Sequence, residues 1–294
     1  MTLTAVEMQD RSVDGMVELR ERRAALLANR CLTWVFGADD PEAVVREVRA
    51  GELRLRVHAP RAPATSALGR PIVLAFHGGG WCWGSPEQSR WMAGRIAART
   101  GAVVVAPAYR LAPEHPYPAA VEDCWAALTW VAAHAADLGA DADRIAVLGD
   151  SAGGTLAAVV ALRARDEGEP RIRGQVLVYP LVDLVGLRGP GLGGIVEHYL
   201  GGDESRAEEW AVSPLRAASH KSLPPALVLT ARFDPLRRHA ERYAAALRTA
   251  GVEVAVHRPA LATHAYLTLP GISPASRAGL ARVLTFLSDV LASP

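Results

Sequence analysis

Two glycine-rich segments of the chain each follow a short apolar run. Residues 149–153 read Gly-Asp-Ser-Ala-Gly after the run 145–148, and residues 77–80 read His-Gly-Gly-Gly after the run 72–76. A serine hydroxyl becomes an effective nucleophile when a base removes its proton and N–H donors stabilise the oxyanion that forms. The two segments therefore predict acyl-transfer chemistry at Ser151, with an oxyanion hole beside it.

The surroundings of Ser151 favour a nucleophile over an ordinary glycine-rich turn. A strand that turns sharply into a helix lifts one side chain into a cleft, provided that the residues two before and two after it are small. Gly149 and Gly153 meet this need, the run 145–148 predicts the strand, and residues 155–165 predict the helix.

Backbone amides near the serine are the expected oxyanion donors. Gly78 and Gly79 allow the chain to approach a substrate closely, and the Ala152 N–H lies at the start of the predicted helix, where it has no partner within the helix. His77 is expected to brace this loop rather than to act as a base.

The general base is one of nine histidines. In a strand-turn-helix site of this kind the chain order is nucleophile, acid, base, which removes the four histidines before Ser151. His264 lies in a loop after the final strand signal and before the final helix signal, from which a side chain reaches over the sheet edge. The other histidines after Ser151 lie in a predicted helix, a predicted strand or an irregular insertion (His239, His257, His198 and His220).

The acid that orients the base is expected directly after a strand. Asp234 follows the apolar run 226–230, and Pro235 ends the strand there. A carboxylate in this position holds the imidazole in the correct tautomer and stabilises the imidazolium. Asp183, which follows the preceding strand, is the alternative.

Apolar runs that alternate with helical patterns must position these residues. Uniformly apolar strands separated by helices are typical of a parallel sheet that is covered on both faces. An amphipathic helix is predicted over residues 15–36 and a half-buried strand over 52–58. Further strands are predicted at 72–76, 103–106, 145–148, 175–179, 226–230 and 252–257, and helices at 86–99, 119–136, 155–165, 236–250 and 273–291. The glycine-dense stretch between Asp183 and Pro224, with a helical piece near 204–211, predicts a mobile loop or lid.

Composition limits the class of protein. The chain has 294 residues, half of them hydrophobic, and a formal net charge of +1 with no basic stripe, which favours one globular domain and argues against nucleic-acid binding. Three cysteines without metal-ligand spacing indicate reduced thiols, and no metal site is expected. No apolar run reaches the length of a membrane span, and residue 1 onward shows no secretory leader, so we expect a cytoplasmic protein.

Five ordered motifs resemble the hormone-sensitive lipase-like esterases, also called bacterial family IV carboxylesterases, over roughly residues 70–291. The motifs are His77-Gly78-Gly79-Gly80-Trp81, the stretch 109–116 with Pro118-Ala119-Ala120, Gly149-Asp150-Ser151-Ala152-Gly153-Gly154, Tyr179-Pro180 with Asp183, and Asp234-Pro235-Leu236. The resemblance implies an α/β-hydrolase fold, in which a mostly parallel central sheet is flanked by helices and carries a small helical cap. It also implies a cap segment over residues 1–45, a catalytic domain over 46–294 and a shortened cap or lid insertion over 184–212.

The resemblance carries roles onto individual residues. It makes Ser151 the nucleophile, Asp234 the acid and His264 the base, in agreement with the assignment from the residues themselves. The oxyanion donors that it implies are the amides of Gly78, Gly79 and Ala152. It makes Glu114 a buried network residue that supports the nucleophile turn, and Trp81, Trp83 and Tyr266 are expected to contact substrate.

Two departures from the family pattern concern the binding site. The family usually follows the catalytic histidine with Gly-Phe, whereas this chain has Ala265-Tyr266. The interval from Ser151 to Asp234 is also short for the family, and the missing length falls after Asp183. We therefore expect a site that is more open or differently shaped.

The predicted function is hydrolysis of carboxylic esters with small acyl groups through an acyl-enzyme, with no cofactor. The expected partner is a small ester, and the protein is expected to be a monomer or a homodimer. The alternatives are a specialised acyl transfer, hydrolysis of a lactone, amide or formamide, or a non-hydrolytic biosynthetic step; kynurenine formamidases have a similar His-Gly-Gly loop. A binding protein that lost the chemistry is disfavoured because no triad residue is missing.

Overall fold

The computed structural model describes residues 33–64 and 67–292, together with Gly15, Glu18 and Arg20. Most of the helix predicted over 15–36, and most of the expected cap segment 1–45, lie outside the described residues. Among those described, α2 (Thr33–Phe36) is a single helical turn. Strand β1 (Ala43–Ala50) then begins the sheet, and the predicted boundary after residue 45 falls inside this strand.

One mostly parallel sheet forms the centre of the described chain, as predicted. Its eight strands lie in the order β1-β2-β4-β3-β5-β6-β7-β8. The pairs β1–β2 and β2–β4 are antiparallel and all the others are parallel. The remaining bounds are β2 (Leu53–Pro60), β3 (Arg70–Phe76), β4 (Val103–Pro107), β5 (Ala140–Asp150), β6 (Ile172–Val178), β7 (Ala226–Leu229) and β8 (Val254–His257).

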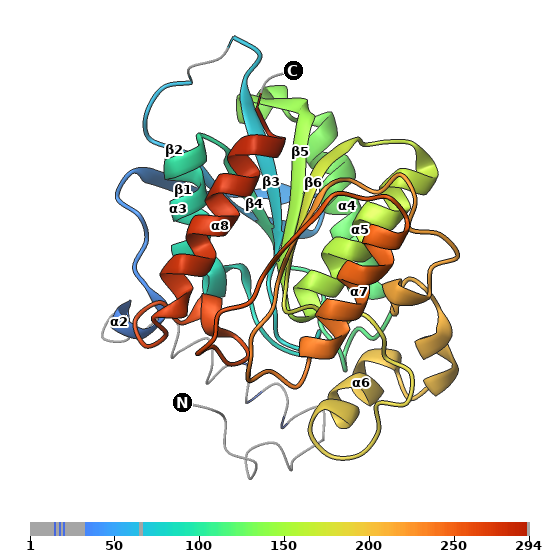
Figure 1. Ribbon diagram of the computed structural model, residues 1–294. Helices are drawn as coiled ribbons and strands as arrows, with labels where there is room; N and C mark the ends of the chain where they lie inside the picture. The colour runs from blue at the N-terminus through green and yellow to red at the C-terminus, as the bar shows by residue number, and fades with distance from the viewer. Residues whose placement is uncertain (1–14, 16–17, 19, 21–32, 65–66, 293–294) are drawn as a thin grey trace.

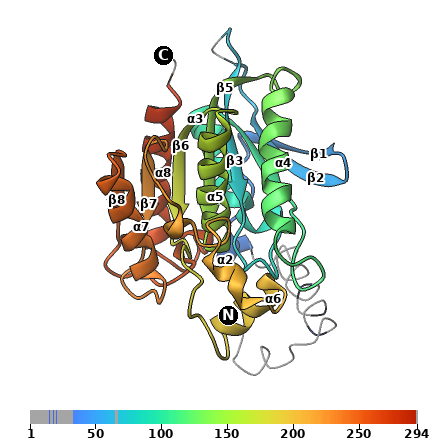
Figure 2. The same ribbon diagram turned by 90° about the vertical axis from the view of Figure 1, so that its right-hand side faces the viewer.

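Helices cover both faces of the sheet, which explains the uninterrupted apolar runs within its central strands, such as residues 72–76 and 145–148. Neighbouring residues such as Val73 and Leu74 belong to two separate hydrophobic clusters because successive side chains point to opposite faces. Helices α3 and α8 cover one face and α4, α5 and α7 the other (Figures 1 and 2). Their bounds are α3 (Arg90–Thr100), α4 (Ala119–Ala133), α5 (Ala152–Glu167), α7 (Arg237–Thr249) and α8 (Ala275–Val290).

The insertion between β6 and β7 is more ordered than its glycine content predicts. It contains α6 (Leu192–Leu200), where a mobile loop was expected, and the predicted helical piece is a 3₁₀ turn at Glu204–Glu208. Within α6, a Cβ on Gly193 would stand 2.3 Å from the backbone of Arg188. Only glycine therefore allows the helix to approach this segment so closely. Helix α6 lies beyond the edge at which the parallel strands end (Figure 1).

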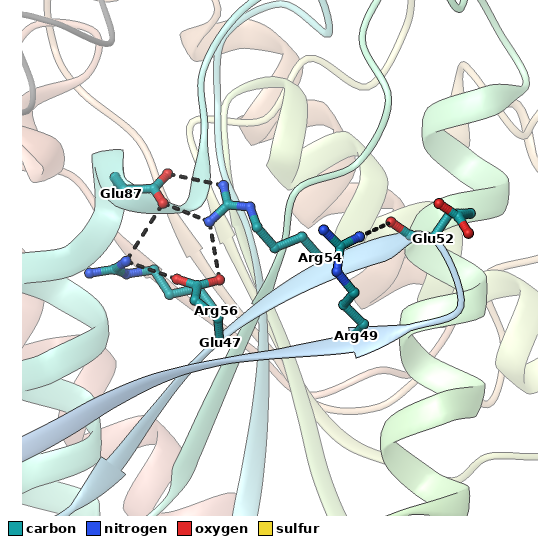
Figure 3. Close-up of polar contacts among 6 residues, drawn as sticks. All are labelled: Glu47, Arg49, Glu52, Arg54, Arg56 and Glu87. Carbon is teal, nitrogen blue, oxygen red and sulfur yellow. Dashed lines mark hydrogen bonds and ion pairs between the residues drawn. The ribbon is translucent and has the colours of Figure 1, made fainter.

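A charged network joins the β1–β2 hairpin to the 3₁₀ turn η2 (Pro86–Ser89), shortly after the His-Gly-Gly-Gly loop (Figure 3). The Arg54 guanidinium donates to Glu87 Oε1 at 2.8 Å and to Glu47 Oε2 at 3.1 Å, and Arg56 donates to Glu47 Oε1 at 3.0 Å. Burial opposes ionisation of Glu87, but the hydrogen bond from Arg54 and further hydrogen bonds outweigh it and lower its pKa to about 2. The network therefore links the β1–β2 hairpin to the segment that follows the His-Gly-Gly-Gly loop in the sequence.

No helix among the described residues has both the length and the apolar character needed to cross a bilayer.

Candidate active site

A sharp turn between β5 and α5 presents Ser151. The serine has φ 54° and ψ −118°, a strained conformation of the kind found at functional sites. A Cβ on Gly149 would lie 2.0 Å from the Gly153 carbonyl oxygen, and a Cβ on Gly153 would lie 2.1 Å from that of Phe76. Both glycines are therefore required by the close approach of backbone to backbone, as the sequence predicted.

The structure brings Ser151, His264 and Asp234 into one hydrogen-bonded line. His264 Nε2 lies 3.0 Å from Ser151 Oγ, and His264 Nδ1 lies 2.9 Å from Asp234 Oδ2. The other carboxylate oxygen of Asp234 accepts the Leu236 N–H at 2.7 Å, which fixes the carboxylate. The Asp234 side chain is fully buried, whereas that of His264 is 32% exposed, so the imidazole is accessible from solvent.

Both alternative residues considered for the acid and the base have other partners. Asp183 accepts hydrogen bonds from Arg216 at 2.8 Å and from Arg242 at 3.3 Å, and it does not contact His264. His77 braces its own loop, as predicted: Nδ1 lies 2.9 Å from the Gly78 carbonyl oxygen, and the ring stacks on Tyr109 with centroids 4.1 Å apart.

Tyr109 is a bracing residue that sequence reasoning missed. Its hydroxyl donates to the His77 carbonyl oxygen at 2.6 Å. Its position in the family-like stretch 109–116 was the available signal, but the contact joins residues 32 positions apart and no local pattern predicts it.

The set of free oxyanion donors differs from the predicted one. The Gly78 N–H donates to the buried Asp150 carboxylate at 2.9 Å, so the prediction of Gly78 as a donor is corrected. Within the described chain, the N–H groups of Gly79, Gly80 and Ala152 have no hydrogen-bond acceptor. The donor set that the geometry leaves available is therefore Gly79, Gly80 and Ala152.

Two of the three residues expected to contact substrate lie in the core instead. Trp81 is fully buried, and Tyr266 is only 1% exposed and packs edge-on against Tyr179 with centroids 5.7 Å apart. Trp83 is partly exposed and lies beside Gly79, whose Cβ would stand 3.0 Å from the Trp83 ring. Large aromatic side chains gain most by full burial, which is why motif position alone misplaced the first two.

Glu114 is also placed differently from the prediction. It is exposed rather than buried, and its carboxylate pairs with the Arg20 guanidinium instead of supporting the nucleophile turn. Burial opposes ionisation of Glu114, but the hydrogen bond from Arg20 prevails and lowers its pKa. Arg20 also donates to the carbonyl oxygens of Cys82, at 2.5 Å, and Ala112. These contacts link Arg20 to the segment after the glycine loop, and no signal in the sequence pairs residues so far apart.

Comparisons with known proteins show which family this chain resembles. A profile of the alpha/beta hydrolase fold family matches residues 73–268. Esterase LipI of Mycobacterium tuberculosis is 40% identical over 255 residues, which span 82% of this chain and 79% of LipI. The ethyl acetate hydrolase of Pseudomonas putida is 31% identical over 92% of this chain and 88% of its own. The crystal structure of EstE1, a thermostable carboxylesterase from a metagenomic library, superposes with a TM-score of 0.85 at 36% identity, covering 95% of this chain and 98% of EstE1.

Proposed function

The chain belongs to the alpha/beta hydrolase fold family, among the hormone-sensitive lipase-like carboxylesterases, and on this premise we propose that Ser151, His264 and Asp234 are its catalytic triad. Its activity is serine-dependent hydrolysis of carboxylic esters. The observation that carries the assignment is the line of two hydrogen bonds, 3.0 Å from Ser151 Oγ to His264 Nε2 and 2.9 Å from His264 Nδ1 to Asp234 Oδ2.

The proposed reaction has two steps. His264 Nε2 accepts the Ser151 proton while Oγ attacks the ester carbonyl carbon, and the imidazolium then donates that proton to the departing alkoxide. His264 next deprotonates a water molecule, which attacks the acyl-enzyme. The imidazolium returns that proton to Ser151 Oγ as the carboxylic acid leaves, and the free enzyme is restored. Asp234 accepts the Nδ1–H throughout, so that the imidazole keeps its tautomer and the imidazolium is stabilised.

The tetrahedral intermediates need N–H donors that are in place before the reaction. We assign this role to the amides of Gly79, Gly80 and Ala152, which have no acceptor among the described residues. Removal of one such donor typically costs about 3 kcal/mol of transition-state stabilisation.

We propose substrates with small acyl groups. The relative from Pseudomonas putida is named for ethyl acetate, an ester of a two-carbon acid, and it matches this chain over nearly its full length. We also propose that the insertion 184–212 forms the cap wall of the site, because Ile195 of α6 lies against Gly80. Three expectations stay predictions: that Trp83 contacts the substrate, that the protein is cytoplasmic, and that it is a monomer or a homodimer.

A chain-length series of p-nitrophenyl esters from acetate to dodecanoate tests this function, with a p-nitroanilide and an aryl formamide alongside. We expect kcat/KM to be highest for the short acyl groups and far lower for both amides. Ser151→Ala should lower kcat at least about 10³-fold. Turnover of Ser151→Ala within a few-fold of the parent would overturn the nucleophile assignment, and a preference for an amide would overturn the substrate class.

A further inference from the structure

The loop that carries two of the proposed oxyanion donors has an unusual backbone. Gly79, Gly80 and Trp81 all have positive φ, at 130°, 59° and 60°. Trp81 has a Cβ, and a left-handed conformation in such a residue persists only where its surroundings hold it. Within the loop, the Cys82 and Trp83 N–H groups both donate to the Gly79 carbonyl oxygen, but these bonds do not fix the loop against the rest of the molecule.

Helix α6 supplies the outer support of this loop. The Trp81 ring stacks on Tyr199 with centroids 4.2 Å apart and an interplanar angle of 10°. One turn earlier, Ile195 lies against Gly80, where a Cβ would stand 2.6 Å from its Cγ2. The Cys82 thiol is directed at the Ile195 carbonyl oxygen at 3.8 Å. Three successive residues of the loop therefore contact the same face of α6.

Tyr117 contacts both the backbone and the ring of Tyr199. The Tyr117 N–H donates to the Tyr199 carbonyl oxygen at 2.7 Å, and the Tyr117 ring packs edge-on against the Tyr199 ring with centroids 6.1 Å apart. The Tyr117 hydroxyl donates to Glu209, which follows the 3₁₀ turn of the same insertion, at 2.6 Å. Both Trp81 and Tyr199 are buried, so neither ring is available to a substrate. Their contact can affect the reaction only by holding the backbone of the loop in place.

We propose that Tyr199 is a positioning residue for ester hydrolysis, which through its stack on Trp81 fixes the Gly79 and Gly80 amides where the oxyanion develops. The proposal rests on the proposed function and adds a role for the insertion beyond that of a wall. Donors for an oxyanion must be placed before the reaction, and a displacement of about 1 Å can cost about 100-fold in rate. The stack acts on the transition state, because the amides bind charge that the ground-state ester lacks.

Two substitutions of Tyr199 test the proposal: one that removes the aromatic ring and one that keeps it. Tyr199→Leu should lower kcat about 10- to 100-fold on p-nitrophenyl acetate while KM changes less than about 3-fold, because only transition-state binding is lost. Tyr199→Phe keeps the stack and should stay within about 2-fold of the parent in kcat. A boronic acid that forms a tetrahedral adduct with the active serine should lose affinity for Tyr199→Leu in parallel with kcat/KM.

Tyr243→Leu is the matched control, since it removes an equally buried tyrosine from α7, remote from the loop. We expect it to lower the melting temperature as Tyr199→Leu does but to keep kcat, with all assays run well below both melting temperatures. The proposal is overturned if Tyr199→Leu keeps parental kcat and boronate affinity, if Tyr199→Phe loses as much as Tyr199→Leu, or if Tyr243→Leu shows the same kinetic loss. Failure of the proposed function is separate, because it appears as an active Ser151→Ala.

Discussion

The buried carboxylate of Asp150 accepts the N–H of Gly78 at 2.9 Å and so joins the residue before Ser151 to the loop of the proposed oxyanion donors. A Cβ on Gly78 would lie 2.4 Å from the other carboxylate oxygen, which shows how closely the two segments approach. Sequence motifs treat the serine turn and the glycine loop as separate features. In the folded protein this contact joins them, and we expect it to fix the position of Ser151 relative to the proposed oxyanion donors.

Asp150→Ala is therefore expected to impair catalysis without removing any group that touches the substrate. It leaves the Gly78 N–H buried without an acceptor, which costs about 1–3 kcal/mol and allows the loop to shift. We expect kcat to fall about 10-fold or more, whereas Asp150→Asn, which retains a side-chain oxygen acceptor, should keep most of it. Steady-state kinetics on p-nitrophenyl acetate measure the difference. Full activity of the alanine variant would show that the contact does not position the loop.

The two aspartates that competed for the role of acid should respond in opposite ways to the same change. Asp234→Asn presents an amide to His264 Nδ1 and no longer enforces its tautomer, so we expect kcat to fall about 10³- to 10⁴-fold. Asp183→Asn weakens contacts with Arg216 and Arg242 and should cost about 1 kcal/mol of stability with kcat unchanged. Kinetics and urea unfolding of both variants decide the matter, and the reverse pattern would exchange the two roles.

Ala265→Gly is expected to stabilise the protein. Ala265 has φ 62° and ψ 13°, a left-handed conformation that costs about 1–2 kcal/mol for a residue with a Cβ and little for glycine. The greater freedom of glycine in the unfolded chain offsets part of this gain, which leaves about 0.5–1 kcal/mol. Urea unfolding tests the change, with Ala262→Gly as the control: Ala262 is buried and lacks a positive φ, so its loss should destabilise. A destabilised Ala265→Gly would contradict the prediction.

His58 should make folding sensitive to mild acid. Its side chain is fully buried in β2, and neither ring nitrogen has a hydrogen-bond partner in the described part of the chain. Burial, helped by the positive charge of Arg56, lowers its pKa to about 4 from an ordinary value of 6.5. Between pH 6.5 and 4 the unfolded chain therefore takes up a proton that the folded chain does not, and stability is lost as the pH falls, by up to about 3 kcal/mol.

His58→Leu removes both this proton uptake and the unpartnered nitrogens. We expect the free energy of unfolding to fall less steeply below pH 6.5 in the variant than in the parent, with the largest gain near pH 4.5 and the smallest at pH 8. Urea titrations at those pH values measure it. Parallel pH profiles for the two proteins would contradict the prediction, because they would show that His58 binds its proton equally in the folded and unfolded states.

Much of the fold and most of the reacting groups were predictable, because both are written in local patterns. Uniformly apolar runs between helical stretches predicted the parallel sheet, and small residues around Ser151 predicted the nucleophile turn. The order of Asp234 and His264 along the chain predicted the acid and base roles that we propose for them. Helix α6 was missed because Gly193 and Gly194 disfavour a helix locally, and burial of Val196, Tyr199 and Leu200 against the rest of the protein overrides that preference.

The chemistry of the site is thus decided largely by the residue types that follow each strand. The carboxyl ends of parallel strands lie at the same edge of the sheet, whatever the length of the segments between them. Three-dimensional contact decides which groups are free to act. The Asp150 carboxylate accepts the Gly78 N–H and leaves the Gly79 and Gly80 amides available. Burial removes Trp81 and Tyr266 from the accessible surface, and Glu114 pairs with Arg20. Each of these outcomes depends on a partner far away along the chain, where competition for space and for hydrogen bonds is settled only on folding.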